Sequence, residues 1–188
     1  MKTILVPTDF SECADAALDL AIVIARQQKA HLLLMHAYSA TLPLESISFE
    51  VIAGENKDSA MHAMKKLRHL CLKIDYQQDI SYDYILKEGD AVKNIVKVAE
   101  DMEAGLIIMG THGEKGVSDF FFGTTTSGVT GLAPCPVMAV PVHASFDRSL
   151  QKITFATNLL KTDLDVIKNV VELARPVNAL INVLHVGD

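Results

Sequence analysis

The sequence predicts an α/β protein whose parallel sheet is covered by helices on both faces. Two apolar runs, Leu-Leu-Leu-Met at 32–35 and Leu-Ile-Ile-Met at 106–109, contain no polar residue. Such runs are typical of central parallel strands, which are buried from both sides. Segments with helical periodicity separate the strands, so the fold is expected to be doubly wound with right-handed crossovers.

The first half of the chain predicts a β-α-β-α-β order. Strands are expected at 3–6, 31–37 and 80–86. An alanine-rich helix is expected at 14–26, with Ser11 or Asp9 as its N-cap. Residues 39–57 are expected to connect the second strand to an amphipathic helix at 59–72.

The second half adds two strands and two helices, which completes a five-stranded sheet. Gly89-Asp90 introduces a helix in which apolar residues recur at helical spacing from Val92 to Ala99. A fourth strand is expected at 106–109 and a fifth at 137–140. Two prolines precede the fifth strand and end the helix predicted at 125–132, because proline cannot continue a helix.

Composition and charge limit the classes of function. The chain has 188 residues, 49% of them hydrophobic, which is enough for one domain with its own core. Its formal net charge of -6 argues against a nucleic-acid or anionic-membrane binder, because such proteins rely on clustered Lys and Arg. No apolar stretch approaches the roughly 20 residues of a membrane span, and the N-terminus lacks a secretory pattern. A cytoplasmic location with reduced cysteine thiols is therefore expected.

A glycine-rich segment after the fourth strand is the best clue to function. Gly110, Gly113 and Gly123 are separated by two and nine residues, and Thr124 follows directly. A glycine loop between a buried strand and a helix can surround a phosphate with backbone N–H groups, and the helix dipole favours the anion. The sequence has neither a Walker A Lys-Ser or Lys-Thr here nor the Rossmann glycines after the first strand. The alternative is a loop that only makes a tight turn.

The spacing resembles that of nucleotide-binding members of the universal stress protein family. Residues 4–11, Ile-Leu-Val-Pro-Thr-Asp-Phe-Ser, resemble the opening strand and turn of that family, and residues 133–137, Ala-Pro-Cys-Pro-Val, resemble its closing signature. The resemblance implies one domain at residues 1–144 and a strand order of 3-2-1-4-5. Strands 1 and 4 are then neighbours, and ligands of such sheets bind at this topological switch point.

The resemblance also implies a set of nucleotide-binding residues. ATP, or another adenine nucleotide, with Mg²⁺ held on its phosphates and no metal ligand from the protein, is expected to contact Pro7, Thr8, Asp9, Ala37, Met109, Gly110, Gly113, Gly123, Thr124 and Thr125. Thr124 stands where many members have Ser, and either hydroxyl can donate to a phosphate. Asp9 could instead cap the first helix, and Ala37 could be ordinary core.

The expected function is that of an ATP-binding stress-response module for binding or signalling. No constellation of residues predicts efficient catalysis, so no catalytic residue is assigned. Two alternatives of other classes stay open, a dimeric interaction module that does not bind nucleotide and a weak ATP hydrolase. The resemblance implies a homodimer or a tandem-domain partner, and neither nucleic acid nor membrane is expected as a partner.

The C-terminal part of the chain repeats its beginning. An offset of 149 residues aligns Ile4 with Ile153 and His36 with His185, without a gap. Residues 145–188 are therefore expected to be a connector and the β-α-β start of a second domain of the same kind, in a chain that is a fragment of a longer tandem protein. The alternative is a short natural tail that docks on the first domain. In this repeat Asn158 replaces Asp9.

Overall fold

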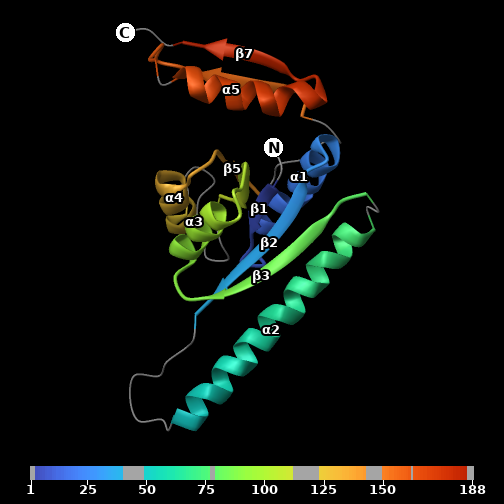
Figure 1. The fold of residues 1–188 in the computed structure, drawn as a ribbon, viewed down its shortest axis with the longest axis vertical. Coiled ribbons are helices and arrows are strands. Elements are labelled where there is room, and N and C mark those ends of the chain that lie inside the picture. Colours follow the sequence, from blue (N-terminus) through green and yellow to red (C-terminus); the bar gives the residue numbers. More distant parts are fainter. Residues whose placement is uncertain are drawn as a thin grey trace.

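The computed structural model describes residues 3–39, 49–76, 79–111, 123–142, 150–161 and 163–185, with only the backbone for 49–58. Its main body is a five-stranded sheet in the order β3-β2-β1-β4-β5, with every neighbouring pair parallel (Figure 1). The strands are β1 Thr3–Pro7, β2 His31–Tyr38, β3 Tyr82–Glu88, β4 Leu106–Gly110 and β5 Val137–Val140. The predicted α/β class and the 3-2-1-4-5 order are both confirmed.

Two pairs of helices cover the two faces of this sheet. Side chains of β1, β2 and β4 that face one side form a core with α1 (Glu12–Gln28) and α2 (Phe49–Asp75). Alternate side chains of the same strands face the other side, where they pack on α3 (Ala91–Asp101) and α4 (Thr124–Leu132). Central strands buried on both faces explain why their sequences are continuously apolar.

Side-chain caps fix the starts of α1 and α3. The Ser11 hydroxyl accepts a hydrogen bond from the Ala14 N–H at 3.2 Å, so Ser11 rather than Asp9 is the N-cap of α1. The Asp90 carboxylate accepts from the Lys93 N–H at 2.9 Å at the start of α3. Each cap satisfies one of the N–H groups that a helix leaves free in its first turn.

The second helix is longer than the sequence indicated. It begins at Phe49, so the prediction that residues 39–57 are a connection is wrong from residue 49 onward. The apolar spacing that identified the helix belongs to the half that packs on the sheet, where Ala63, Leu67 and Ile74 are buried. Residues 49–58 contain one glycine and no proline, so the helix can propagate through them at one backbone hydrogen bond per residue.

The C-terminal part forms a second, smaller β-α-β unit. Strands β6 (Lys152–Ala156) and β7 (Leu180–Leu184) pair in parallel, and α5 (Asp163–Ala174) and a 3₁₀ turn (Arg175–Val177) connect them. The partial β-α-β repeat predicted from the 149-residue offset is present in the backbone. Leu173 of α5 packs against the core that contains α1. None of the helices in the described part of the chain is long and apolar enough to cross a membrane.

Candidate functional site

The turn after β1 holds three of the predicted site residues. Pro7 ends the strand and is buried, and the Thr8 N–H donates to the Met35 carbonyl of β2 at 2.8 Å. The Thr8 hydroxyl accepts from the Phe10 N–H at 3.0 Å, and one Asp9 carboxylate oxygen accepts from the Ser11 N–H at 3.0 Å. Asp9 is exposed. Its second oxygen is therefore in a position to accept a hydrogen bond from a ligand.

His36 of β2 supports this turn from the neighbouring strand. Its Nδ1 lies 2.7 Å from the Thr8 carbonyl oxygen, and because a carbonyl only accepts, Nδ1 carries the proton and donates. The His36 ring also contacts the Phe10 ring, with the two centroids 4.4 Å apart. Sequence reasoning did not assign His36 to the site. The only signal for it was its match to His185 in the repeat.

Gly110 ends β4 against the first turn of α1. A Cβ on Gly110 would lie 2.7 Å from the Cys13 Cβ and 2.9 Å from the Cys13 carbonyl carbon. The glycine therefore lets α1 approach the sheet. Among the described glycines only Gly89 has a positive φ, so it is the missing side chain of Gly110, and not a left-handed backbone, that this position requires. Met109, one residue earlier, is 5% exposed and belongs to the core on the α3 and α4 face.

Hydrogen bonds join the end of β4 to β5 and to the start of α4. The Thr111 N–H donates to the Val140 carbonyl at 3.0 Å, and the Gly123 N–H donates to the Thr111 carbonyl at 2.7 Å. The buried Thr126 hydroxyl donates to the Gly110 carbonyl at 2.8 Å. The predicted Gly113 lies outside the described residues. The ends of the glycine loop are therefore held together next to β1, the strand that pairs with β4.

No side chain among the described residues caps the first turn of α4. Its N-cap is Gly123, which lacks a side chain, and no acidic residue stands in the turn. By contrast, the side chains of Ser11 and Asp90 cap α1 and α3. Thr124 is exposed and Thr125 is half-buried. The free N–H groups and the positive end of the helix dipole at this position favour an anion.

Ala37 stands at the end of β2 and is half-buried. It packs against the same core as Met109, on the α3 and α4 face of the sheet.

The structure thus brings the ends of β1, β2 and β4 and the start of α4 to one edge of the sheet, as the topology predicted. Of the predicted site residues only Gly113 is not placed. Sequence reasoning missed Thr126, which nothing distinguishes from the two threonines before it.

The cysteines have the properties of packed thiols. Burial raises the pKa of the Cys135 thiol. Burial is also the larger cause of the raised pKa of the Cys71 thiol, and the nearby Asp75 carboxylate is the smaller one. Both shifts favour the protonated thiol over the nucleophilic thiolate. Over the described ranges, no three His, Cys, Asp or Glu side chains lie close enough together to hold a metal ion.

Comparison with known proteins identifies the family. The family model described as the universal stress protein family matches residues 1–141. The chain belongs to the universal stress protein family. Universal stress protein MJ0531 of Methanocaldococcus jannaschii is 31% identical over 143 residues, which cover 74% of this chain and 81% of that protein.

Solved structures of universal stress proteins share the fold. Universal stress protein UspA from Lactobacillus plantarum superposes with a TM-score of 0.67 at 26% identity, and the match covers 74% of this chain and 97% of that one. A universal stress protein solved in complex with cAMP superposes with a TM-score of 0.56 at 23% identity, over 77% of this chain and 98% of that one.

Proposed function

We propose that this universal stress protein binds an adenine nucleotide, ATP with Mg²⁺ on its phosphates, and acts as a stress-response module for binding or signalling. The observation that carries the proposal is the N-terminus of α4, which no described side chain caps and which hydrogen bonds hold at the end of β4. It lies at the same edge of the sheet as the turn that exposes Asp9. A helix start without a cap or an acidic residue suits a phosphate.

The residues at this edge divide into two kinds. The backbone N–H groups of the first turn of α4 and the Thr124 hydroxyl would donate to phosphate oxygens. The exposed Asp9 carboxylate would accept from the adenine amino group or a ribose hydroxyl, while its bond to the Ser11 N–H fixes its direction. Ala37 offers a small apolar contact for the base. The cAMP complex of a protein with the same fold supports an adenine ligand.

The proposal is tested by isothermal titration calorimetry of the chain with ATP, ADP and AMP in the presence of Mg²⁺. We expect saturable heat with one site per chain. The Asp9→Asn variant keeps an oxygen that can accept from the Ser11 N–H but loses the charge, so its stability should be unchanged. Loss of a hydrogen bond to a charged group, about 1.5–3 kcal/mol, should weaken binding about 10- to 100-fold. No heat at millimolar ATP would reject the proposed function.

A second proposal concerns the C-terminal unit. We infer that residues 145–188 are the connector and the beginning of a second domain of the same fold, after a first domain at residues 1–144. The strand register supports this inference. Thr3 of β1 pairs with His31 of β2, and the residues 149 positions later, Lys152 of β6 and Leu180 of β7, pair in the same way. Hydrogen exchange should show the β6 and β7 amides opening as a unit apart from the main sheet. If the β6 and β7 amides exchanged with the same protection as the amides of β1, the inference would be contradicted.

A further inference from the structure

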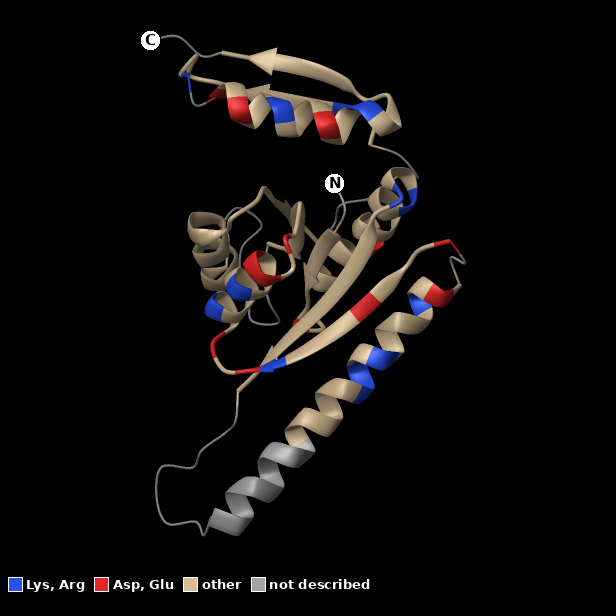
Figure 2. Cartoon of the chain, viewed as in Figure 1, with Lys and Arg blue, Asp and Glu red and all other residues tan. Residues whose placement is uncertain are grey.

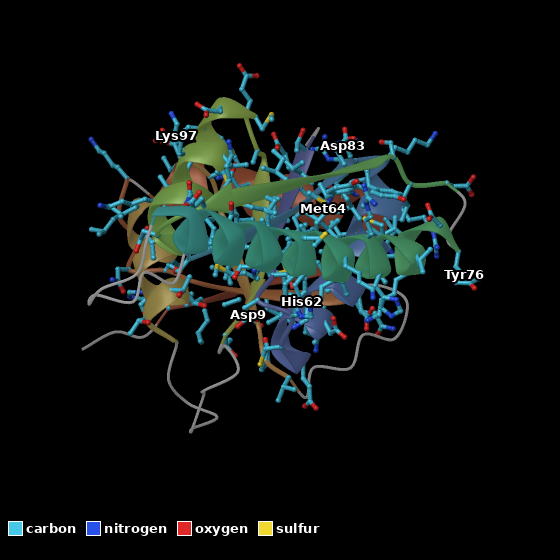
Figure 3. The ribbon with its side chains drawn as sticks, turned by 90° about the horizontal axis from the view of Figure 1, so that it is seen from below. Asp9, His62, Met64, Tyr76, Asp83 and Lys97 are labelled. Carbon is cyan, nitrogen blue, oxygen red and sulfur yellow. The ribbon has the colours of Figure 1, made fainter. Side chains whose placement is uncertain are left out.

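A groove of about 650 Å³ lies between the start of α1 and the outer face of α2. We define the α2 groove by Phe10, His62, Lys65, Lys66, Arg68 and His69, which line it. Figure 3 looks onto α2 and shows His62 on the side of the helix where Asp9 lies. The groove is on the α1 and α2 face of the sheet, whereas α4 covers the other face, so it is separate from the phosphate end of the proposed nucleotide site.

The cations of the α2 groove outnumber its carboxylates, because Asp15 of α1 is the one acidic residue in the described lining, against Lys65, Lys66 and Arg68. No Asp or Glu occurs between residues 59 and 74, although the chain as a whole carries a net charge of -6. The Asp15 carboxylate is already paired with a lysine just beyond the groove, since the Lys73 Nζ lies 3.2 Å from an Asp15 carboxylate oxygen and 3.8 Å from one of Asp19. Among the described residues no such ion pair joins Lys65, Lys66 or Arg68. Figure 2 shows the basic stretch as blue segments along α2.

The groove also offers apolar surface. The Phe10 ring is half-buried, and the Lys66 Nζ stands 5.1 Å from its centroid, in the range of a cation–π contact. Leu70 and Leu72 line the groove as well, and Leu72 is 51% exposed. A ligand that fits must therefore carry both negative charge and apolar groups, because an inorganic anion would leave the Phe10 ring and the exposed Leu72 in water.

We propose that the α2 groove binds an extended acidic peptide segment of a partner protein that carries apolar side chains among its carboxylates. The groove follows α2 from His62 to Leu72, which is about 15 Å of helix. That length matches about five residues of extended chain. Carboxylates of the segment would pair with Lys65, Lys66 and Arg68, and an apolar side chain would cover Phe10. Charge complementarity and the mixed lining carry this inference, which does not depend on nucleotide binding.

The experiment measures fluorescence anisotropy of a fluorescein-labelled peptide of alternating glutamate and leucine, titrated with the full chain at low ionic strength. We expect saturable binding, and none of a lysine–leucine peptide. Reversal of Lys65, Lys66 and Arg68 to Glu should weaken binding by about tenfold or more, since three exposed ion pairs at about 0.5 kcal/mol each are lost. Phe10→Ala, which changes no charge, should also weaken it.

A matched variant distinguishes binding in the groove from a general effect of the protein's net charge. Lys87, Lys93 and Lys161 are exposed and lie outside the groove, and their reversal to Glu changes the net charge by the same amount. This variant should bind the peptide almost as well as the parent chain, with circular dichroism confirming that both variants fold. Equal loss of binding in the two variants would overturn the proposal. The proposal would also be overturned if inorganic tripolyphosphate displaced the peptide at concentrations below the peptide's own Kd.

Discussion

Replacement of Gly123 by Asp should make the protein more stable and at the same time weaken nucleotide binding. Gly123 is the N-cap of α4, with φ -60° and ψ 160°, an extended conformation that any residue adopts. Asp90 caps α3 from a similar conformation, φ -61° and ψ 128°, by accepting from the Lys93 N–H. An Asp at position 123 should cap α4 in the same way and occupy the place proposed for a phosphate.

The two effects have different magnitudes. An Asp cap is worth a few tenths of a kcal/mol more than Gly, and a negative charge at a helix start adds about 0.3–1 kcal/mol. The free energy of unfolding should thus rise by about 0.5–1 kcal/mol. A carboxylate about 5 Å from a phosphate charge is repelled by about 3 kcal/mol at an effective dielectric constant of about 20. Solvent screening reduces this to about 1–2 kcal/mol, a loss of about 5- to 30-fold in affinity.

Gly123→Asn is the matched control, because Asn caps a helix without adding charge. Urea denaturation gives the stability of each variant, and calorimetry with ATP and Mg²⁺ gives its affinity. Asn should stabilise somewhat less than Asp and weaken binding much less. If the Asp variant is stabilised but binds ATP as tightly as the parent chain, the phosphate does not lie at this helix start. If the Asn variant loses as much affinity as the Asp variant, repulsion by the charge is not the cause.

Three further predictions concern stability and titration. Gly110→Ala should lower the free energy of unfolding by about 1–3 kcal/mol, because its Cβ would lie 2.7 Å from that of Cys13. Gly131→Ala should raise the free energy of unfolding by about 0.5–1 kcal/mol in the same denaturation assay, because no described atom outside its own stretch of helix lies within 4 Å of the added Cβ. The hydrogen bond to Asp75 raises the pKa of Tyr82 to about 12. The ultraviolet titration curve of the Tyr82→Phe variant, subtracted from that of the parent chain, should therefore leave a single transition with its midpoint near that value. The stabilisation from this bond is complete below the ordinary tyrosine pKa and is lost as the pH rises from about 10 to 12.

Strands and short helices could be predicted because their signals are local. The fifth strand occupies Val137–Val140 as expected, since two prolines fix where it can begin. The start of α2 could not be predicted, because the apolar spacing that reveals a helix is present only where the helix packs on the sheet. The strand order came from resemblance to a family, because pairing between distant strands leaves no local pattern in one sequence.

The candidate site could be predicted where topology alone determines position. Asp9 and Gly110 follow neighbouring strands, so their meeting at one edge required only the strand order. The hydrogen bonds from Thr126 to Gly110 and from His36 to Thr8 join residues 16 and 28 positions apart, and either side chain could equally have faced solvent. Gly110 was expected to contact a ligand, and that remains a prediction; the structure adds that a glycine here makes room for α1.

The repeat separates residues that shape the fold from residues that suit a ligand. In the first unit the His36 Nδ1 lies 2.7 Å from the Thr8 carbonyl oxygen. In the repeat the His185 Nδ1 lies 2.9 Å from the Thr157 carbonyl oxygen. A left-handed residue also follows two positions after each threonine, with φ 67° at Phe10 and 60° at Leu159.

The two turns therefore share one backbone geometry, while Asp9 is replaced by Asn158 and Pro7 by Ala156. If the histidine–threonine bond served only the ligand, it would have no reason to persist where the carboxylate is gone. Its presence in both units assigns it to the architecture of the β-α-β turn. The Asp9 carboxylate remains as the feature of the first turn that the fold itself does not require.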